Sequence, residues 1–336
     1  MRRRSSRKWP ESGGGWRKPN NIASVSYGAF GAMFLGTQPP SRDVQYVQIP
    51  RFSSGLMTGA VPAGAARKGG VSGGMVFLVA IIMLAAGFGA AYYILPRGGT
   101  PPAKTNLLVG TNMPFPPFED FNRSNGEIEG FDIDIAALVA TELGRTLVVR
   151  QFSSFTTLLA TVGTGGVDMS VSAITMSGSA GSQRNATMDF SDPYYNANQG
   201  VLVQTGSSLT CTASTCTNAS LASLNVGVQQ GTTSESWLND NKVASTTVTV
   251  FQTVDLEVAA LTAGSIDAVL IDLDPAESLA SPGSGLRVAG AIITNELYGI
   301  AVPNGDPDNI LSAINTVLAR IRASGAYDTL ILKWFG

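Results

Sequence analysis

The residues whose types best suit binding of a charged small molecule are one arginine, one aspartate and a pair of threonines. Arg184 stands six positions before the run F-S-D-P-Y-Y, and its planar guanidinium could hold a carboxylate through two parallel hydrogen bonds. Thr232 and Thr233 follow a glycine turn in V-G-V-Q-Q-G-T-T-S, where the N–H groups of a helix start bind anions. Asp272 ends the predicted strand A-V-L-I. Acids are rarely buried without a partner, so this aspartate is expected to face one.

The numbers of histidines and cysteines exclude some classes of metal and catalytic site. The chain has no histidine and two cysteines, which excludes a zinc tetrad and a histidine-dependent triad. Cys211 and Cys216 are separated by T-A-S-T, a spacing that suits a small disulfide loop if this part of the chain is exported. Glu129, Asp132 and Asp134 form an acidic cluster for which a metal site is conceivable. Complementing the dipole of the helix that they begin is the simpler role.

The first hundred residues differ from the rest in charge and hydropathy. Residues 1–74 are rich in Gly, Ser, Pro and Arg and predict a disordered, basic cytoplasmic tail. Residues 75–95 carry no charge and are long enough to span a membrane, with Arg67 and Lys68 on the cytoplasmic side. Residues 96–105 would be a tether. A cleaved signal peptide, or a start at Met57, remains an alternative for this region.

The remainder predicts an α/β body in which strands alternate with helices. Strands are expected at 107–110, 147–149 and 167–171, with helices at 131–143 and 155–162 between them. A second cycle has strands at 224–228, 247–250 and 268–271 and helices at 234–241 and 254–263. A final helix is expected at 310–321. The chain would cross between the two units near residues 200–204 and 293–298.

Several motifs occur in an order that resembles one protein family. They are V-G-T-N-M-P-F-P-P-F-E, G-F-D-I-D-I-A, an arginine before F-S-D-P-Y-Y, and the closing Y-D-T-L-I-L-K-W-F-G. Together they resemble the extracytoplasmic solute-binding proteins that serve amino-acid ABC importers. The resemblance implies a two-lobed body of the type II periplasmic-binding-protein fold with hinge strands. Lobe 1 would comprise 106–203 and 295–336, and lobe 2 would comprise 204–294.

The resemblance also assigns roles to particular residues. Arg184 and Thr233, and less directly Thr232, would bind a ligand carboxylate, while Asp272 would take its ammonium group. A surface position for Arg184 and simple capping by the threonines are the alternatives. The chain departs from the family pattern because G-S-A-G-S-Q separates Thr175-Met176-Ser177 from Arg184. Asp272 could instead cap a helix, although Asp274 before Pro275 is the better candidate for that cap.

Five further positions are expected at the ligand by resemblance. Ser172 would offer a carbonyl and Thr175 a hydroxyl to the ammonium group, Phe115 would cover the ligand and Phe155 would line its side-chain pocket. Ordinary core packing is the alternative for the two aromatic residues. Asn112 occupies a position where relatives that bind basic side chains often carry an acid. A neutral amide there favours a polar, uncharged ligand side chain.

These expectations combine into a single-pass membrane protein whose extracytoplasmic body binds a polar amino acid and delivers it to an ABC permease. The membrane contact would be residues 75–95, and no cofactor, metal or nucleic acid is expected. One alternative is an exported enzyme similar to prephenate or arogenate dehydratases, in which a carboxyl group of raised pKa acts as the acid. Another is the ligand-sensing domain of a signalling complex.

Overall fold

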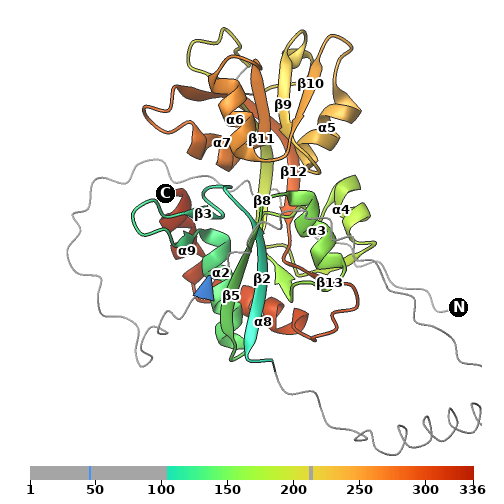
Figure 1. Cartoon of the computed structure of the whole chain (residues 1–336), viewed down its shortest axis with the longest axis vertical. Coiled ribbons are helices and arrows are strands. Elements are labelled where there is room, and N and C mark those ends of the chain that lie inside the picture. The colour runs from blue at the N-terminus through green and yellow to red at the C-terminus, as the bar shows by residue number, and fades with distance from the viewer. Residues whose placement is uncertain (1–44, 47–103, 212–214) are drawn as a thin grey trace, which may run out of the picture. The chain divides into compact units, whose positions relative to one another are not determined.

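The computed structural model describes residues 45–46, 104–211 and 215–336. Residues 104–336 form two α/β lobes, and each lobe is built on its own sheet. Two long antiparallel strands, β8 (Tyr195–Gln204) and β12 (Leu286–Tyr298), belong to the sheet of the second lobe and run from it toward the first. Figure 1 shows these strands between the lobes. A short hairpin of β3 (Asp120–Phe121) and β4 (Ile128–Glu129) lies in the first lobe.

The sheet of the first lobe is parallel at its centre and antiparallel at one end. Its order is β1 (Gln45–Tyr46), β5 (Thr146–Phe152), β2 (Asn106–Asn112), β6 (Met169–Ser170), β13 (Ala301–Pro303) and β7 (Met188–Phe190). β5, β2 and β6 are parallel, whereas β13 runs antiparallel to both of its neighbours. Parallel neighbours require crossover connections, which helices provide here. The carboxyl ends of β2 and β6 therefore lie on the same edge.

Helices cover both faces of this sheet. They are α2 (Phe131–Glu142), α3 (Phe155–Gly163), α4 (Gly178–Arg184), α8 (Leu311–Ala323) and α9 (Ala326–Phe335). α2, α8 and α9 enclose one hydrophobic cluster, and α3 packs on a separate one. The first cluster contains closely packed aromatic rings, including Phe118, Phe131 and Tyr298, all of them fully buried. Its packing holds the loop after β2 rigidly against the sheet.

The second lobe repeats the same design at a smaller size. Its sheet has the order β10 (Thr247–Phe251), β9 (Asn225–Gln229), β11 (Ala268–Asp272), β8 and β12. The helices α5 (Thr233–Asn241), α6 (Val254–Thr262) and α7 (Leu273–Leu279) follow three of these strands. A short 3-10 helix, Asn218–Leu221, precedes β9, and a disulfide joins Cys211 to Cys216 just before it.

Most strands and helices of the body lie where the sequence pattern places them, within a few residues at their ends. The amphipathic pattern at 310–321 corresponds to α8, and the apolar runs at 224–228 and 268–271 correspond to β9 and β11. Two of the α-helices in the described part of the chain were not expected. α4 is formed by residues with little hydrophobic pattern, and α9 is formed by the closing motif.

The expectations for residues 1–44 and 47–103, including the predicted membrane-spanning segment 75–95, lie outside the described residues. None of the helices in the described part of the chain combines the length and hydropathy that a membrane-spanning helix requires. Gln45 and Tyr46 differ from the predicted disordered tail, because they pair in parallel with Val148 and Val149 of β5. An edge strand offers unpaired backbone groups, so even a two-residue segment can pair with it.

Candidate functional site

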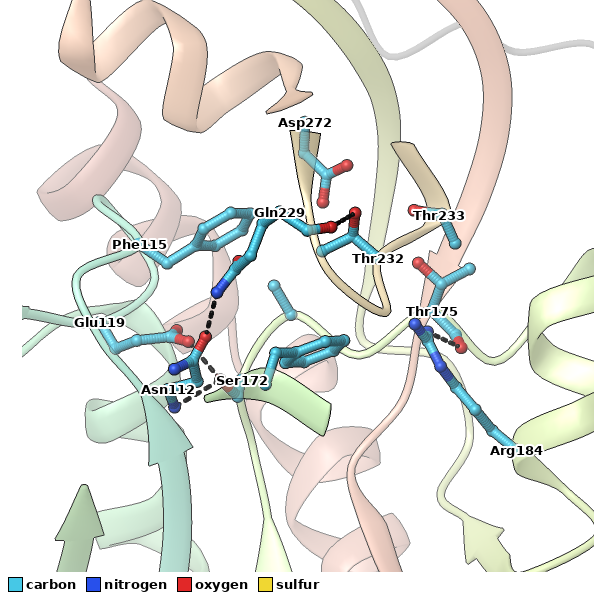
Figure 2. Close-up of a pocket in the computed structure, with 12 residues that line it drawn as sticks. Asn112, Phe115, Glu119, Ser172, Thr175, Arg184, Gln229, Thr232, Thr233 and Asp272 are labelled. Carbon is cyan, nitrogen blue, oxygen red and sulfur yellow. Dashed lines mark hydrogen bonds between the residues drawn. The ribbon is translucent and has the colours of Figure 1, made fainter. Parts of the chain in front are cut away.

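One pocket lies between the two lobes and contains all nine residues that the sequence singled out for a ligand (Figure 2). About 330 Å³ of space, part of it open to solvent, lies among its lining atoms. The nine predicted residues in its lining are Asn112, Phe115, Phe155, Ser172, Thr175, Arg184, Thr232, Thr233 and Asp272. Three more, Glu119, Ala173 and Gln229, were not predicted. Eight of the twelve come from the first lobe and four from the second, so the pocket is complete only when the lobes face each other.

Arg184 carries a buried positive charge into this pocket. Its side chain is 7% exposed, and its Nη1 and Nη2 donate to the carbonyls of Thr175 at 2.7 Å and Gly231 at 3.2 Å. The guanidinium also lies over the ring of Phe155, 5.3 Å from its centroid. Burial lowers the pKa of Arg184 to about 10, although Glu296 and Asp272 oppose that shift. Within the described residues it makes no ion pair, so it can accept a carboxylate from outside the protein.

The additional residues before Arg184 form α4 and do not displace the arginine from the site. Arg184 is the last residue of this seven-residue helix, which begins after Ser177. Gly181 allows the helix to pack directly on the preceding chain, because a Cβ there would lie 2.1 Å from the Met176 carbonyl. The guanidinium therefore reaches the pocket from the end of a short helix, as Figure 2 shows.

Asp272 enters the pocket from the opposite lobe, at the end of β11. Its carboxylate accepts hydrogen bonds from the amide of Gln199 and from the hydroxyl of Tyr298. Burial raises the pKa of Asp272 to about 8, and nearby Glu296 adds to the shift, while Tyr298, Gln199 and Arg184 oppose it. A neighbouring cation would favour its charged form.

The prediction that Asp274 caps the following helix is wrong. α7 begins at Leu273, so Asp272 occupies the N-cap position and Asp274 lies in the first turn. The side chain of Asp272 nevertheless makes no capping hydrogen bond. The helix starts earlier than predicted because Pro275 is accommodated at its third residue, where no N–H partner is required. Asp272 is therefore at the helix start, yet its carboxylate is turned toward Gln199 and Tyr298.

The two threonines lie at the start of α5 as expected. Gly231 has φ 80°, a conformation that favours glycine, and it turns the chain from β9 into the helix. Thr232 is the N-cap, and its Oγ1 accepts from the N–H of Glu235 at 3.3 Å. The Oγ1 of Thr233 accepts from Gln199 Nε2 at 3.3 Å. The helix start thus adds partial positive charge to the pocket near Arg184.

A pair of amides bridges the lobes at the other end of the pocket. Gln229 Nε2, from the second lobe, donates to Asn112 Oδ1 of the first lobe at 2.9 Å. Asn112 Nδ2 in turn donates to the carbonyl of Phe152 at 2.8 Å. The rings of Phe115 and Phe155 also line this pocket. The arrangement combines uncharged hydrogen-bonding groups with apolar walls, as small-molecule sites usually do.

Ser172 and Thr175 lie in the loop after β6, but their hydroxyls already have protein partners. Ser172 Oγ accepts from the N–H of Asn112 at 3.0 Å and donates to Glu119. Thr175 Oγ1 donates to Glu296 Oε2 at 2.7 Å. The predicted contact between the Thr175 hydroxyl and an ammonium group therefore requires that hydroxyl to be shared with Glu296.

Gln199 and Glu296 are central to the polar network around the pocket, and the sequence did not reveal them. Gln199 Nε2 lies within hydrogen-bonding distance of Asp272 and of Glu296 Oε1, the latter at 2.7 Å. Its Oε1 accepts from Ser234 Oγ. Gln199 is fully buried, but the sequence carried little signal of this, because the strand also contains Asn196, Asn198 and Gln204. Only the pairing of β8 with β11 and β12 shows that it faces the site.

The pocket thus has a cation on one lobe and an acid on the other, with hydrogen-bonding amides beyond them. Burying a zwitterion is unfavourable unless each of its charges is paired. Arg184 with the start of α5 could pair a carboxylate, and Asp272 could pair an ammonium group. The arrangement is that of a binding site for a molecule that carries both groups.

Comparison with known proteins identifies the family and the fold. The sequence pattern of the bacterial extracellular solute-binding proteins, family 3, matches residues 107–336. The chain belongs to this family. The family consists of solute-binding proteins, and the two lobes with a pocket between them are consistent with that membership.

Similar proteins include some that are named for particular amino acids. The L-cystine-binding protein TcyJ of Escherichia coli K12 is 29% identical over 231 residues, which cover 68% of this chain and 82% of that protein. A probable histidine-binding protein of Neisseria gonorrhoeae is 31% identical over 237 residues, with the same two coverages. The ABC transporter glutamine-binding protein GlnH of Bacillus subtilis is 31% identical over 215 residues, covering 63% of this chain and 75% of that protein.

Solved structures show the same architecture. An ancestral arginine-binding protein bound to arginine superposes with a TM-score of 0.62 and 31% identity, covering 70% of this chain and 100% of its own. The same kind of protein bound to glutamine gives a TM-score of 0.63 at 31% identity, covering 69% and 99%. The body is therefore a two-lobed, periplasmic-binding-protein-like fold.

Proposed function

We propose that this protein captures a polar amino acid in the pocket between its lobes and delivers it to an ABC permease. The observation that carries the proposal is the placement of Arg184 and Asp272 on opposite lobes of one pocket, each buried and neither in an ion pair among the described residues. A zwitterion that bridges them would bind the closed arrangement better than the open one. Ligand binding would then shift the population toward closure.

The far end of the pocket supports an uncharged, polar side chain for the ligand. Asn112 and Gln229 present amide groups, and each can donate and accept hydrogen bonds. Relatives are named for cystine, histidine and glutamine, and similar structures hold arginine or glutamine. Glutamine is the ligand in that group whose carboxamide would match an amide pair. We therefore place glutamine and related neutral amino acids first among the candidates.

We further propose that residues 75–95 anchor the protein in the membrane, with the lobes on the extracytoplasmic side. The absence of charge over this stretch and the basic residues before it support the proposal. A membrane-crossing anchor and the pairing of Gln45–Tyr46 with β5 exclude each other, because residues 45–46 would lie on the opposite side of the membrane. Protease protection of residues 1–70 in intact spheroplasts is expected if the anchor crosses.

Binding of the free amino acids by the purified body, residues 100–336, tests the receptor function. Isothermal titration against the twenty amino acids, with prephenate as the competing candidate, should give a saturable signal for neutral polar amino acids. Arg184→Ala should weaken that binding by about 3–5 kcal/mol, since it leaves a buried carboxylate of the ligand unpaired. For a micromolar ligand this moves the Kd toward the millimolar range.

A matched control separates loss of charge recognition from loss of fold. Arg320→Ala removes an arginine whose partner, Glu142, lies on the outside of the first lobe away from the pocket. It should leave the Kd unchanged. Normal binding by Arg184→Ala would overturn the site assignment, and turnover of prephenate without amino-acid binding would favour an enzyme over a receptor.

A further inference from the structure

Beneath the pocket lie two carboxyl groups that the proposed contacts with an amino acid do not use. Glu119 and Asp132 are both fully buried, and each carboxyl group shifts the pKa of the other. Glu119 Oε2 and Asp132 Oδ1 have no hydrogen-bond partner within the described part of the chain. Two carboxyl groups buried near each other without a cation disfavour double ionisation, because desolvation and like-charge repulsion both act against it. A proton between the two unpaired oxygens would satisfy both of them.

The other oxygens of this pair are bound to the loop that lines the pocket. Asp132 Oδ2 accepts from the N–H of Ala173 at 2.9 Å and from the hydroxyl of Tyr194 at 2.8 Å. Glu119 Oε1 accepts from the hydroxyl of Ser172. Both Ser172 and Ala173 line the ligand pocket, as does Glu119 itself. The pair thus connects the start of α2 and the loop after β2 to the floor of the site.

The loop needs this support because its backbone is strained. Ala173 has φ 47°, in the left-handed region that residues other than glycine rarely occupy. Such a conformation persists only where surrounding contacts hold it. The hydrogen bond from the Ala173 N–H to Asp132 is one of those contacts, and the bond from Ser172 to Glu119 is next to it.

The hydrogen-bond donors around the pair indicate which carboxyl group holds the proton. Asp132 accepts from two donors, and both favour its charged form. Glu119 accepts from the hydroxyl of Ser172, and Thr111 also favours its charged form. Burial raises the pKa of Glu119 well above its usual range, and the charge of Asp132 raises it further. Burial also raises the pKa of Asp132, to about 7, against those donors. Glu119 is therefore the protonated member.

We propose that Glu119 and Asp132 are positioning residues that share one proton and hold the Ser172–Ala173 floor of the ligand pocket in its binding conformation. Loss of that proton places two adjacent negative charges in a dry environment. The repulsion releases the floor, and ligand affinity falls. This inference rests on the proposed function, because its main consequence concerns amino-acid binding.

Among the described residues, no lysine or arginine contributes to the pKa shift of either carboxyl group. The titratable groups there that act on the two carboxyl groups are each other and Tyr194, and Tyr327 senses the charge of Asp132. Both tyrosines are neutral at physiological pH, since burial raises their pKa values.

Glu119→Gln tests the proposal, because glutamine reproduces a neutral carboxyl group that donates to Asp132 and accepts from Ser172. The Kd of this variant for the amino acid found by titration should stay within about threefold of the wild-type value near pH 7. Above about pH 8 the wild-type Kd should rise more than the Kd of Glu119→Gln, because only the wild type can lose this proton. Glu119→Ala should bind weakly at every pH.

Infrared spectroscopy gives a readout that does not depend on any ligand. The wild-type protein above neutral pH should show the carbonyl band of a protonated carboxylic acid, and a difference spectrum should show that this band is reduced in Glu119→Gln. Glu127→Gln is the matched control, since Glu127 is half-buried in the turn between β3 and β4 and accepts from Asn125. It should change neither the band nor the Kd.

The outcomes separate this inference from the proposed function. If no amino acid binds but the difference band is present, the acid pair stands and the receptor function fails. If an amino acid binds, and wild type and Glu119→Gln show the same pH profile with no difference band, the shared proton is refuted and the receptor function stands.

Discussion

Asp272 makes ligand binding dependent on pH in a direction that the structure determines. Its pKa of about 8 means that the unliganded protein holds a proton there at neutral pH. Pairing with an ammonium group requires the charged form, so binding must release that proton. Each pH unit below the pKa reduces the apparent affinity about tenfold, or about 1.4 kcal/mol.

The expected size of the effect follows from that value. Between about pH 8 and about pH 6 the Kd should rise on the order of 50- to 100-fold, equivalent to about 2.5 kcal/mol. Isothermal titration at several pH values gives the slope. Titration at about pH 7 in buffers of different ionisation enthalpy gives the number of protons released, which should approach one. Asp272→Asn should bind more weakly and lose the slope over this range.

A Kd that stays constant between about pH 6 and about pH 8, with no proton released, would refute the role of Asp272 as the partner of the ammonium group. This range lies below the pH at which loss of the proton shared by Glu119 and Asp132 is expected to weaken binding. Rising pH therefore strengthens binding within this range, through Asp272, and weakens binding above it, through the acid pair. Glu119→Gln should keep the slope that Asp272 produces. The two variants therefore report on separate protons.

Three further predictions concern stability and specificity. The pKa of Asp272 is higher in the folded protein than the usual value of about 3.9, so the folded state binds more protons and the free energy of unfolding should fall as pH rises from about 4 to about 8; urea titrations of wild type and Asp272→Asn should show a larger loss in the wild type. Replacing Cys211 and Cys216 by serine should lower the free energy of unfolding by about 2 kcal/mol, because the disulfide closes a short loop. The Kd should stay unchanged, because this loop lies away from the pocket. A large change in the Kd measured by calorimetry would contradict this expectation. Asn112→Asp introduces a carboxylate opposite Gln229 and should shift preference toward lysine and arginine at least about tenfold, measured as the ratio of Kd values for arginine and glutamine.

Local pattern was sufficient to predict much of the body. The apolar runs that form β9 and β11, and the amphipathic run that forms α8, were readable because strands and helices have different periods. The start of α5 was readable from the glycine turn and the following threonine cap. α4 was missed, because Gly178–Arg184 has small, polar residues with no apolar face. Contact with Met176 and the pocket, more than intrinsic propensity, accounts for that helix.

The residues of the candidate site likewise divide into those that the sequence revealed and those that it did not. Arg184, Asp272 and the threonines could be chosen from the sequence because their chemistry and their places at element ends suit a charged ligand. Gln199, Glu296 and Glu119 could not, since each looks like an ordinary polar residue until distant strands are paired. Gln199 contacts Asp272 across 73 positions and Glu296 across 97.

The sequence by itself determined the alternation of strands and helices and the types of residue available for a carboxylate and an ammonium group. Only the tertiary structure decided that Glu119 and Asp132 share a buried environment, that Arg184 has no carboxylate partner among the described residues, and that Asp272 holds its proton at neutral pH. The physical reason is that burial and the distance between charges set these properties. Both arise from contacts between segments far apart in the chain, on which local sequence pattern carries no information.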